Sequence, residues 1–156
     1  MFKIAKNINT FNEQVNARIV NVEVHNIDHQ NNRLINQTLQ ELEINISGTI
    51  DDDACSMHFI ISKPIKDYYD IKEYQKVEIE IDHIFDSYIM INEVVYADPL
   101  IELEILRFND EFVFSMFFRD YDNEFFGNAE FNIKLKELEQ KEESKVVNQY
   151  RERNNE

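Results

Sequence analysis

The chain has 156 residues, of which 31 are acidic and 16 are basic, so its formal net charge is −15 at pH 7. Its two glycines exclude collagen-like and glycine-rich linker classes, and its many Phe, Tyr, Ile and Val residues argue against acidic disorder. Direct binding of nucleic acid is disfavoured, because phosphates are met by Lys and Arg. The single cysteine excludes an intramolecular disulfide framework.

The length and the charge distribution predict one main domain. A chain of this size buries roughly two-thirds of its unfolded surface in a single core. It has no apolar signal segment and no apolar run approaching the ~20 residues that span a bilayer, so we expect a cytoplasmic protein without membrane contact. Residues 134–156 carry six basic and six acidic side chains, which leaves the whole negative excess in residues 1–133. We therefore divide the chain into a β-rich domain, residues 1–134, and a C-terminal helix or tail, residues 135–156.

The first half of the chain predicts strands with short helical insertions. Residues 10–13 have the spacing of a capping box, which favours a short helix near the N-terminus. Alternating apolar residues then predict strands over residues 17–27, 41–50 and 55–61. Pro64 opens a tyrosine-rich stretch, residues 65–74, that suits a short helix or an ordered loop.

The second half predicts closely spaced antiparallel strands. Short turn signals, such as Asp86-Ser87, Asp98-Pro99 and Asn109-Asp110, separate them. The expected strands are residues 77–82, 88–96, 100–108, 112–118 and 125–135. The predicted fold class is therefore mainly β, an antiparallel meander that forms a sandwich or a partly open barrel.

The turn at Asn109-Asp110 fixes the register of one hairpin. A two-residue loop pairs Phe108 with Glu111. It then places six apolar residues on one face: Ile101, Leu103, Ile105, Phe114, Met116 and Phe118. A slip of one residue would bring glutamates among these side chains. The other face is mixed: Glu102, Glu104, Leu106, Phe108, Val113, Ser115, Phe117 and Arg119. Because strand 111–119 is apolar on both faces, we expect a helix, another sheet or a second subunit to cover it.

The tail predicts a helix over about residues 135–150. Glu137 and Lys141 have the favourable i, i+4 spacing, and Leu135, Leu138 and Val146 fall roughly on one face. We interpret it as a solvated C-terminal helix. The alternative is that it docks on a partner, in which case the tail or strand 111–119 would support a homo-oligomer.

No motif in the sequence predicts catalysis, a metal site or a cofactor. There is no glycine-rich phosphate loop, P-loop, dinucleotide fingerprint or nucleophile elbow. Three features leave alternatives open: the cluster of His25, Asp28 and His29 as metal ligands, the acidic loops 51–53 and 120–124 as calcium ligands, and Cys55 as a nucleophile. We interpret them as loop polarity, turns and a buried small hydrophobe, and we expect neither a cofactor nor enzymatic activity.

Acidic residues two apart on predicted strands are the sharper feature. Such residues share a face and lie ~6.6–6.8 Å apart, whereas one DNA strand carries a phosphate every ~3.4 Å, so two adjacent ladders would be needed to imitate one strand. We predict that a protein partner with a basic surface binds these residues: Glu78, Glu80, Asp82, Glu102, Glu104, Glu41 and Glu43. The alternative is an ordinary solvated sheet face.

Two functions follow as hypotheses. The first is a non-enzymatic acidic protein that docks on a basic surface of a protein partner. A phage or mobile-element inhibitor, or a nucleic-acid mimic, would fit this description, and the abundance of Asn, Ile and Lys is typical of AT-rich coding sequences. The second is a structural or assembly subunit of a homo-oligomer or of a larger, phage-like complex.

Overall fold

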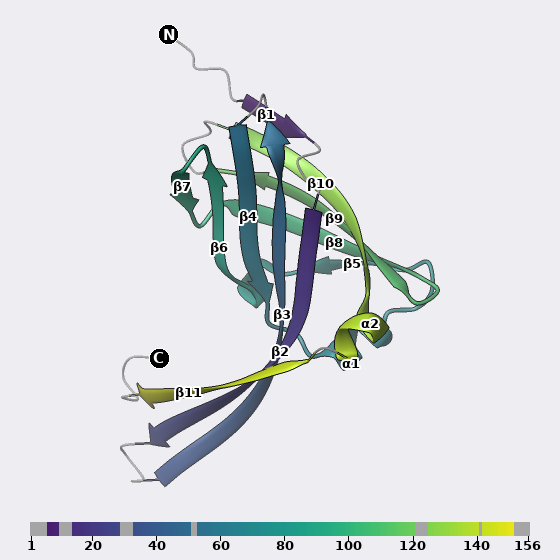
Figure 1. Cartoon of the computed structure of the whole chain (residues 1–156). Coiled ribbons are helices and arrows are strands. Elements are labelled where there is room, and N and C mark those ends of the chain that lie inside the picture. Colours follow the sequence, from purple (N-terminus) through teal and green to yellow (C-terminus); the bar gives the residue numbers. More distant parts are fainter. Residues whose placement is uncertain are drawn as a thin grey trace.

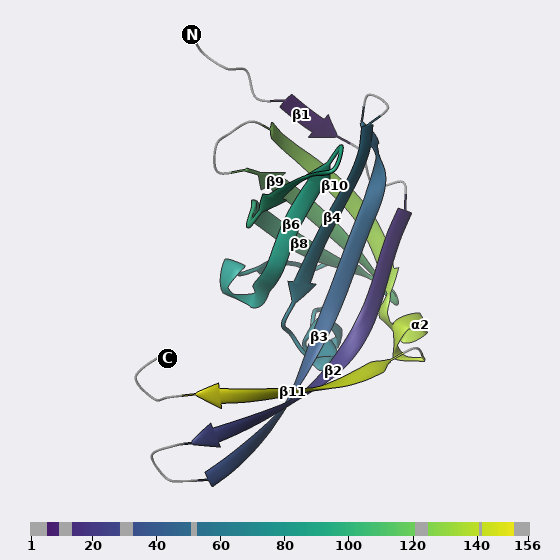
Figure 2. The same cartoon turned by 60° about the vertical axis from the view of Figure 1, so that its left-hand side comes forward.

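The described residues form a β-sandwich. The computed structural model describes residues 6–9, 14–28, 33–50, 53–120, 125–140 and 142–151. Their strands make two sheets that lie face to face, and the strands of one sheet run obliquely across those of the other (Figure 1, Figure 2). The mainly β fold class and its sandwich form are confirmed. The predicted division into residues 1–134 and residues 135–156 stays a prediction.

The first sheet, which we call the six-stranded sheet, is antiparallel except at one edge, where β11 runs parallel to β2. In spatial order it contains β11 (Glu143–Arg151), β2 (Gln14–Asp28), β3 (Arg33–Ile50), β4 (Asp53–Ile61), β6 (Ile84–Ile91) and β7 (Val94–Ala97).

The second sheet, the five-stranded sheet, carries the candidate functional site on its outer face. It is antiparallel except for its first strand, which runs parallel to its neighbour. In spatial order it contains β1 (Lys6–Asn9), β10 (Phe125–Lys134), β9 (Glu111–Arg119), β8 (Leu100–Phe108) and β5 (Lys76–Ile79). Consecutive strands β8, β9 and β10 form a meander, as β2, β3 and β4 do in the other sheet.

Short helices lie where the chain passes from one sheet to the other. They are α1 (Ile65–Tyr69), the 3-10 helix η1 (Ile81–His83) and α2 (Leu135–Glu139). The first confirms the short helix predicted within residues 65–74. The guanidinium of Arg107 donates hydrogen bonds to the carbonyls of Tyr69 (2.7 Å) and Ile71 (2.8 Å), which ties the end of α1 to β8. The capping-box stretch, residues 10–13, lies outside the described residues.

The core lies between the two sheets and is built by alternation along the strands. The predicted stripe on β4 is confirmed, because Cys55, Met57, Phe59 and Ile61 are all buried. From the opposite sheet, Phe114 stacks on Phe131 with 5.3 Å between the ring centroids. Each of these residues faces inward because every second side chain of a strand points to the same face.

The predicted hairpin of β8 and β9 is confirmed residue by residue. Ile101 lies opposite Phe118, Leu103 opposite Met116, and Ile105 opposite Phe114. All six side chains are buried. The turn residue Asn109 has a φ of 57°, as a two-residue hairpin loop requires.

The expected single strand over residues 88–96 is wrong, because two strands occupy this region. Asn92 and Glu93 both have positive φ values, 48° and 69°, and form the tight turn between β6 and β7. The turn signal at Asp86-Ser87 marks a bulge instead of a turn: Asp86 has a φ of 52°, and the register between β4 and β6 shifts there.

Two further boundaries need correction. The strand predicted over residues 77–82 ends at Ile79, and Asp82 lies in η1. The helix predicted over residues 135–150 begins at the expected residue, Leu135, but ends at Glu139, and residues 143–151 form β11 instead. The pairing with β2 along the full length of β11 outweighs the helix propensity of this Lys- and Glu-rich stretch.

A three-stranded arm extends from the sandwich. It consists of β11 and the adjoining parts of β2 and β3 (Figure 1, Figure 2). On β2, Ile19 belongs to the main core, whereas Val20, Val22 and Val24 form a separate buried cluster. Up to Ile19 the buried and partly buried core residues of β2 have odd numbers, and from Val20 onward the buried residues have even numbers. Because successive side chains of a strand point to opposite faces, the buried side chains of the arm lie on the opposite face of β2 from those of the sandwich.

The described helices are short, and none of them has the length and apolar character needed to cross a membrane.

Candidate functional site: an acidic groove on the five-stranded sheet

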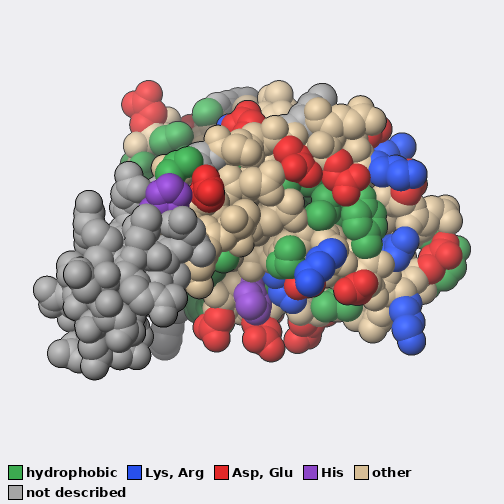
Figure 3. Space-filling model, turned by 90° about the horizontal axis from the view of Figure 1, so that it is seen from below, with side chains coloured by type: hydrophobic (Ala, Val, Ile, Leu, Met, Phe, Trp, Pro, Cys, Tyr) green, Lys and Arg blue, Asp and Glu red, His purple; other side chains and the backbone are tan. Residues whose placement is uncertain are grey.

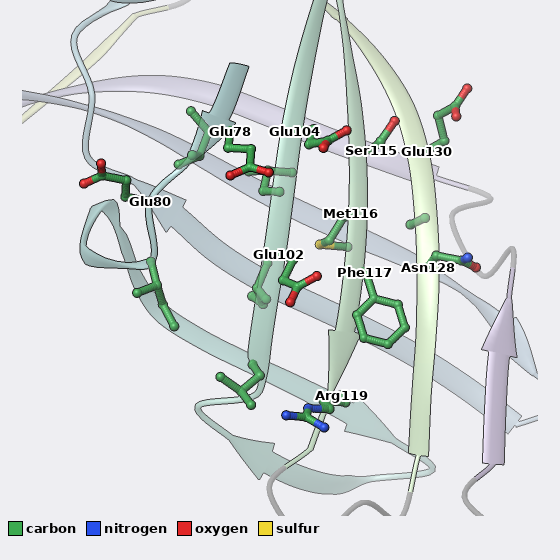
Figure 4. Close-up of a pocket in the computed structure, with 16 residues that line it drawn as sticks. Glu78, Glu80, Glu102, Glu104, Ser115, Met116, Phe117, Arg119, Asn128 and Glu130 are labelled. Atoms are coloured by element: carbon green, nitrogen blue, oxygen red, sulfur yellow. The ribbon is translucent and has the colours of Figure 1, made fainter. Parts of the chain in front are cut away.

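A groove of about 970 Å³ lies on the outer face of the five-stranded sheet, across β5, β8, β9 and β10 (Figure 4). Its size is at the upper end of the ~300–1,000 Å³ typical of ligand pockets. Inward-facing residues such as Leu103 and Met116 contribute to its floor. The side chains that face the groove come from outward positions of four strands and lie in three rows across the sheet.

The first row is acidic. Glu78 of β5 lies directly opposite Glu104 of β8, Glu104 lies opposite Ser115 of β9, and Ser115 lies opposite Glu130 of β10. Three carboxylates and a hydroxyl therefore cross the sheet in register. Side chains opposite each other on neighbouring strands are ~4.5–5.5 Å apart at Cβ, so the pairing of Glu78 with Glu104 is a repulsive contact.

The second row combines a carboxylate with an aromatic ring. Glu102 lies opposite Phe117, and Phe117 lies opposite Asn128. Phe117 is 40% exposed, and its ring lies 6.4 Å from that of Phe126. An exposed phenylalanine supported by a second ring provides a rigid apolar surface in the middle of the groove.

The third row contains the groove's positive charge. Arg119 at the end of β9 lies opposite Leu100 on one side and Phe126 on the other. Among the lining residues, all of which the structure describes, it is the one Lys or Arg side chain. It lies beyond Glu102 and Phe117, at the end of the groove away from the acidic row (Figure 4).

Three of the groove's carboxylates, those of Glu78, Glu102 and Glu104, are not neutralised by the described part of the chain. Glu78, Glu102 and Glu104 form no ion pair with any described residue, and neither does Arg119. The end of the molecule seen in Figure 3 differs, because lysine and arginine side chains there lie among the acidic ones. The groove therefore combines local negative charge, an apolar centre and a separate cation.

The seven acidic residues predicted from the sequence do not all come together. Glu78, Glu80, Glu102 and Glu104 line the groove, which shows that two of the predicted ladders adjoin. Glu80 follows the end of β5 and points away from the other labelled carboxylates (Figure 4). Asp82 is exposed in η1 and does not line the groove.

The predicted pair on β3, Glu41 and Glu43, belongs to the other sheet. Glu43 is only 6% exposed, and its carboxylate accepts a hydrogen bond from Arg18 Nε at 2.5 Å. The same guanidinium reaches Glu143 of β11 at 2.7 Å. The hydrogen bond that Arg18 donates to Glu43 raises the pKa of Arg18 above its usual value. Arg18 therefore links three strands of the six-stranded sheet, β2, β3 and β11, and the buried Glu43 is not presented to a partner.

Several groove residues were missed in the sequence, although signals for them exist. Ser115, Phe117 and Arg119 belong to the mixed face of the predicted hairpin, so its register already places them beside Glu102 and Glu104. Asn128 and Glu130 alternate with the buried Ala129 and Phe131, which identifies the outward face of β10. The sequence does not predict that β5 pairs with β8, because η1 and the β6–β7 hairpin separate the two strands along the chain.

The other sequence candidates form no second site within the residues that the structure describes. Cys55 is buried within the core. Nε2 of His25 lies 4.0 Å from Oε2 of Glu23. His29 and residues 51–52 and 121–124 lie outside the described residues. Within the described ranges, no three His, Cys, Asp or Glu side chains are grouped as a metal ion would require.

Comparison with known proteins finds no matching family model, no similar curated protein and no similar solved structure.

Proposed function

We propose that the protein is a non-enzymatic binding protein whose acidic groove docks a basic segment of a protein partner. The observation that carries this proposal is the direct pairing of Glu78 with Glu104 beside Glu102, without a cation from the described chain. Like charges on neighbouring strands lower the stability of the free protein. A basic partner would remove that repulsion, so the relief of the repulsion would favour the complex over the free protein.

Shape and apolar surface support the same proposal. The groove has room for a few side chains, and Phe117 offers an aromatic anchor of the kind that dominates binding energy at protein interfaces. The net charge of −15 would accelerate the encounter with a basic partner. An inhibitor that occupies the basic site of a phage or host protein would use these properties, as would a nucleic-acid mimic.

The test separates the groove from the overall charge. The probe is a labelled, amidated nonapeptide, Arg-Ser-Arg-Ser-Leu-Ser-Arg-Ser-Arg, whose binding is followed by fluorescence anisotropy. One protein variant carries Glu78→Gln, Glu102→Gln and Glu104→Gln. A matched variant carries Glu73→Gln, Glu93→Gln and Glu137→Gln, at three exposed sites that do not line the groove. Each variant loses three negative charges, so the two have the same net charge.

We expect the groove variant to bind the peptide about tenfold more weakly than the matched variant, since each exposed ion pair contributes up to ~1 kcal/mol. Affinity for the unmodified protein should also fall as salt is raised. Equal affinities for the two variants, or no binding of the peptide to the unmodified protein, would contradict the proposal.

A second candidate function is assembly into a larger complex. The observation that favours it is the arm, where β11 and parts of β2 and β3 extend from the sandwich (Figure 1). Two exposed apolar residues of the arm, Leu39 and Val146, are available for contacts. Sedimentation velocity at several concentrations tests this candidate: self-association that Val146→Asp abolishes would support it, and a monomer at every concentration would exclude a homo-oligomer.

A further inference from the structure

The groove has charges of opposite sign at its two ends, and we infer that it selects an extended partner segment with the complementary order: a basic residue, an apolar residue and an acidic residue at alternate positions. This inference rests on the proposed function. It goes beyond that function because it assigns a second charge preference to the site and names Arg119 as the residue that sets it.

The three rows of the groove have a regular spacing. Ser115, Phe117 and Arg119 are two residues apart on β9, and each marks one row. Two residues along a strand span ~6.6–6.8 Å, so the acidic row and Arg119 are about 13 Å apart. An extended segment that lies along β9 repeats the same step. Its first, third and fifth side chains therefore match the acidic row, Phe117 and Arg119 in turn.

Arg119 is suited to bind a carboxylate from outside the chain. Its side chain is exposed, its cross-strand neighbours Leu100 and Phe126 are apolar, and it forms no ion pair with a described residue. A guanidinium presents a planar fork of donors that matches a carboxylate with two parallel hydrogen bonds. A uniformly basic segment would instead place a like charge against it.

The centre of the groove favours an apolar side chain between the two charges. Phe117 and Phe126 form a tilted pair with 6.4 Å between their centroids. The ring of Phe117 lies between the carboxylates of Glu78 and Glu104 and the guanidinium of Arg119 (Figure 4). A leucine or aromatic residue of the partner would cover this pair and shield both charged ends from water, which strengthens the interactions at each end.

The test compares two nonapeptides with the same leucine centre. The basic peptide is the one described above, and the segregated peptide, Arg-Ser-Arg-Ser-Leu-Ser-Asp-Ser-Asp, has aspartates at one end. Their Kd values are measured at one salt concentration for the unmodified protein, Arg119→Glu and Lys136→Glu. Lys136 is exposed on α2 and does not line the groove, so Lys136→Glu is a control with the same change in charge.

We expect Arg119→Glu to shift the ratio of the two affinities about fivefold in favour of the basic peptide, because one exposed ion pair is lost and a repulsion replaces it. Arg119→Gln should shift the ratio in the same direction by a smaller factor. Lys136→Glu should leave the ratio unchanged within twofold. Equal ratios in Arg119→Glu and Lys136→Glu would overturn the inference, whereas groove-dependent binding of the basic peptide would still support the proposed function. If neither peptide binds, both fail.

Discussion

The two sheets of the sandwich each carry a pair of glutamates two residues apart on one strand, but the surroundings of the two pairs differ. On the six-stranded sheet, Glu43 lies opposite Arg18 and is buried in an ion pair. On the five-stranded sheet, Glu104 lies opposite another glutamate, Glu78, on one side and Ser115 on the other. The same sequence pattern is therefore part of the scaffold in one sheet and a candidate binding surface in the other.

The difference shows that the cross-strand neighbour decides the role of an acidic residue. A carboxylate that faces a guanidinium can be buried and can hold strands together. A carboxylate that faces another carboxylate stays in solvent, where the repulsion is tolerable because water screens it. Carboxylates that lie opposite each other on neighbouring strands, as Glu78 and Glu104 do, are therefore a better sign of a binding site than acidic composition is.

The largest effect that would test this comparison is the loss of Arg18. We expect Arg18→Ala to lower the free energy of unfolding by about 2 kcal/mol, because the buried carboxylate of Glu43 loses its cation. Arg119→Ala removes the same side chain from the groove and should change stability by no more than about 0.5 kcal/mol, since Arg119 is exposed. Urea unfolding of both variants gives the two values, and similar losses would contradict the distinction between the two sheets.

The sequence alone predicts much of the sandwich but only part of the groove. The β8–β9 hairpin is predictable because its turn and its apolar pattern agree on one register, and that register already places Glu102 and Glu104 beside Phe117 and Arg119. The role of Glu43 is not predictable in this way, since its alternation resembles that of Glu104 and only the pairing of β2 with β3 shows the partner.

The C-terminal strand illustrates the same limit. Residues 143–151 have charged and polar residues that suit a solvated helix, and the local pattern favours one. The parallel pairing of β11 with β2 is a contact between residues more than 100 positions apart in the sequence, as the hydrogen bond from Arg18 to Glu143 shows. Tertiary pairing of this kind outweighs propensity, and a local pattern carries no information about it.

A smaller effect on stability is expected from a buried side chain, Tyr68, in the core of the sandwich. The hydroxyl of Tyr68 is buried and has no hydrogen-bond partner among the described residues. We expect Tyr68→Phe to raise the free energy of unfolding by about 1 kcal/mol at pH 7, because it removes a buried group whose hydration is lost on folding. Thermal or urea unfolding checks this, and a loss of stability would show that the hydroxyl has a partner.

The same residue predicts a dependence on alkaline pH. Burial, and to a smaller extent the charge of Asp67, raises the pKa of Tyr68 above its usual value of 10.0. The unfolded chain therefore releases this proton first as the pH rises, and stability falls above about pH 10, by up to ~1.4 kcal/mol per pH unit for this group. Tyr68→Phe should show a shallower loss between pH 10 and 11, while below pH 9 the two proteins should differ by a constant amount.

The smallest effect lies in the groove itself and tests the repulsion directly. Glu104→Gln removes one of two opposed carboxylates, so we expect the free energy of unfolding to rise by about 0.5 kcal/mol at low ionic strength. In 1 M salt the Debye length is only ~3 Å, and most of this gain should disappear. The control is Glu73→Gln, which removes the same charge from an exposed position outside the groove. If Glu104→Gln lowers stability, or if its effect equals that of Glu73→Gln at every salt concentration, Glu78 and Glu104 do not repel each other. In that case there would be no repulsion in the groove for a partner to relieve, and the two sheets would differ only in how deeply their glutamates are buried.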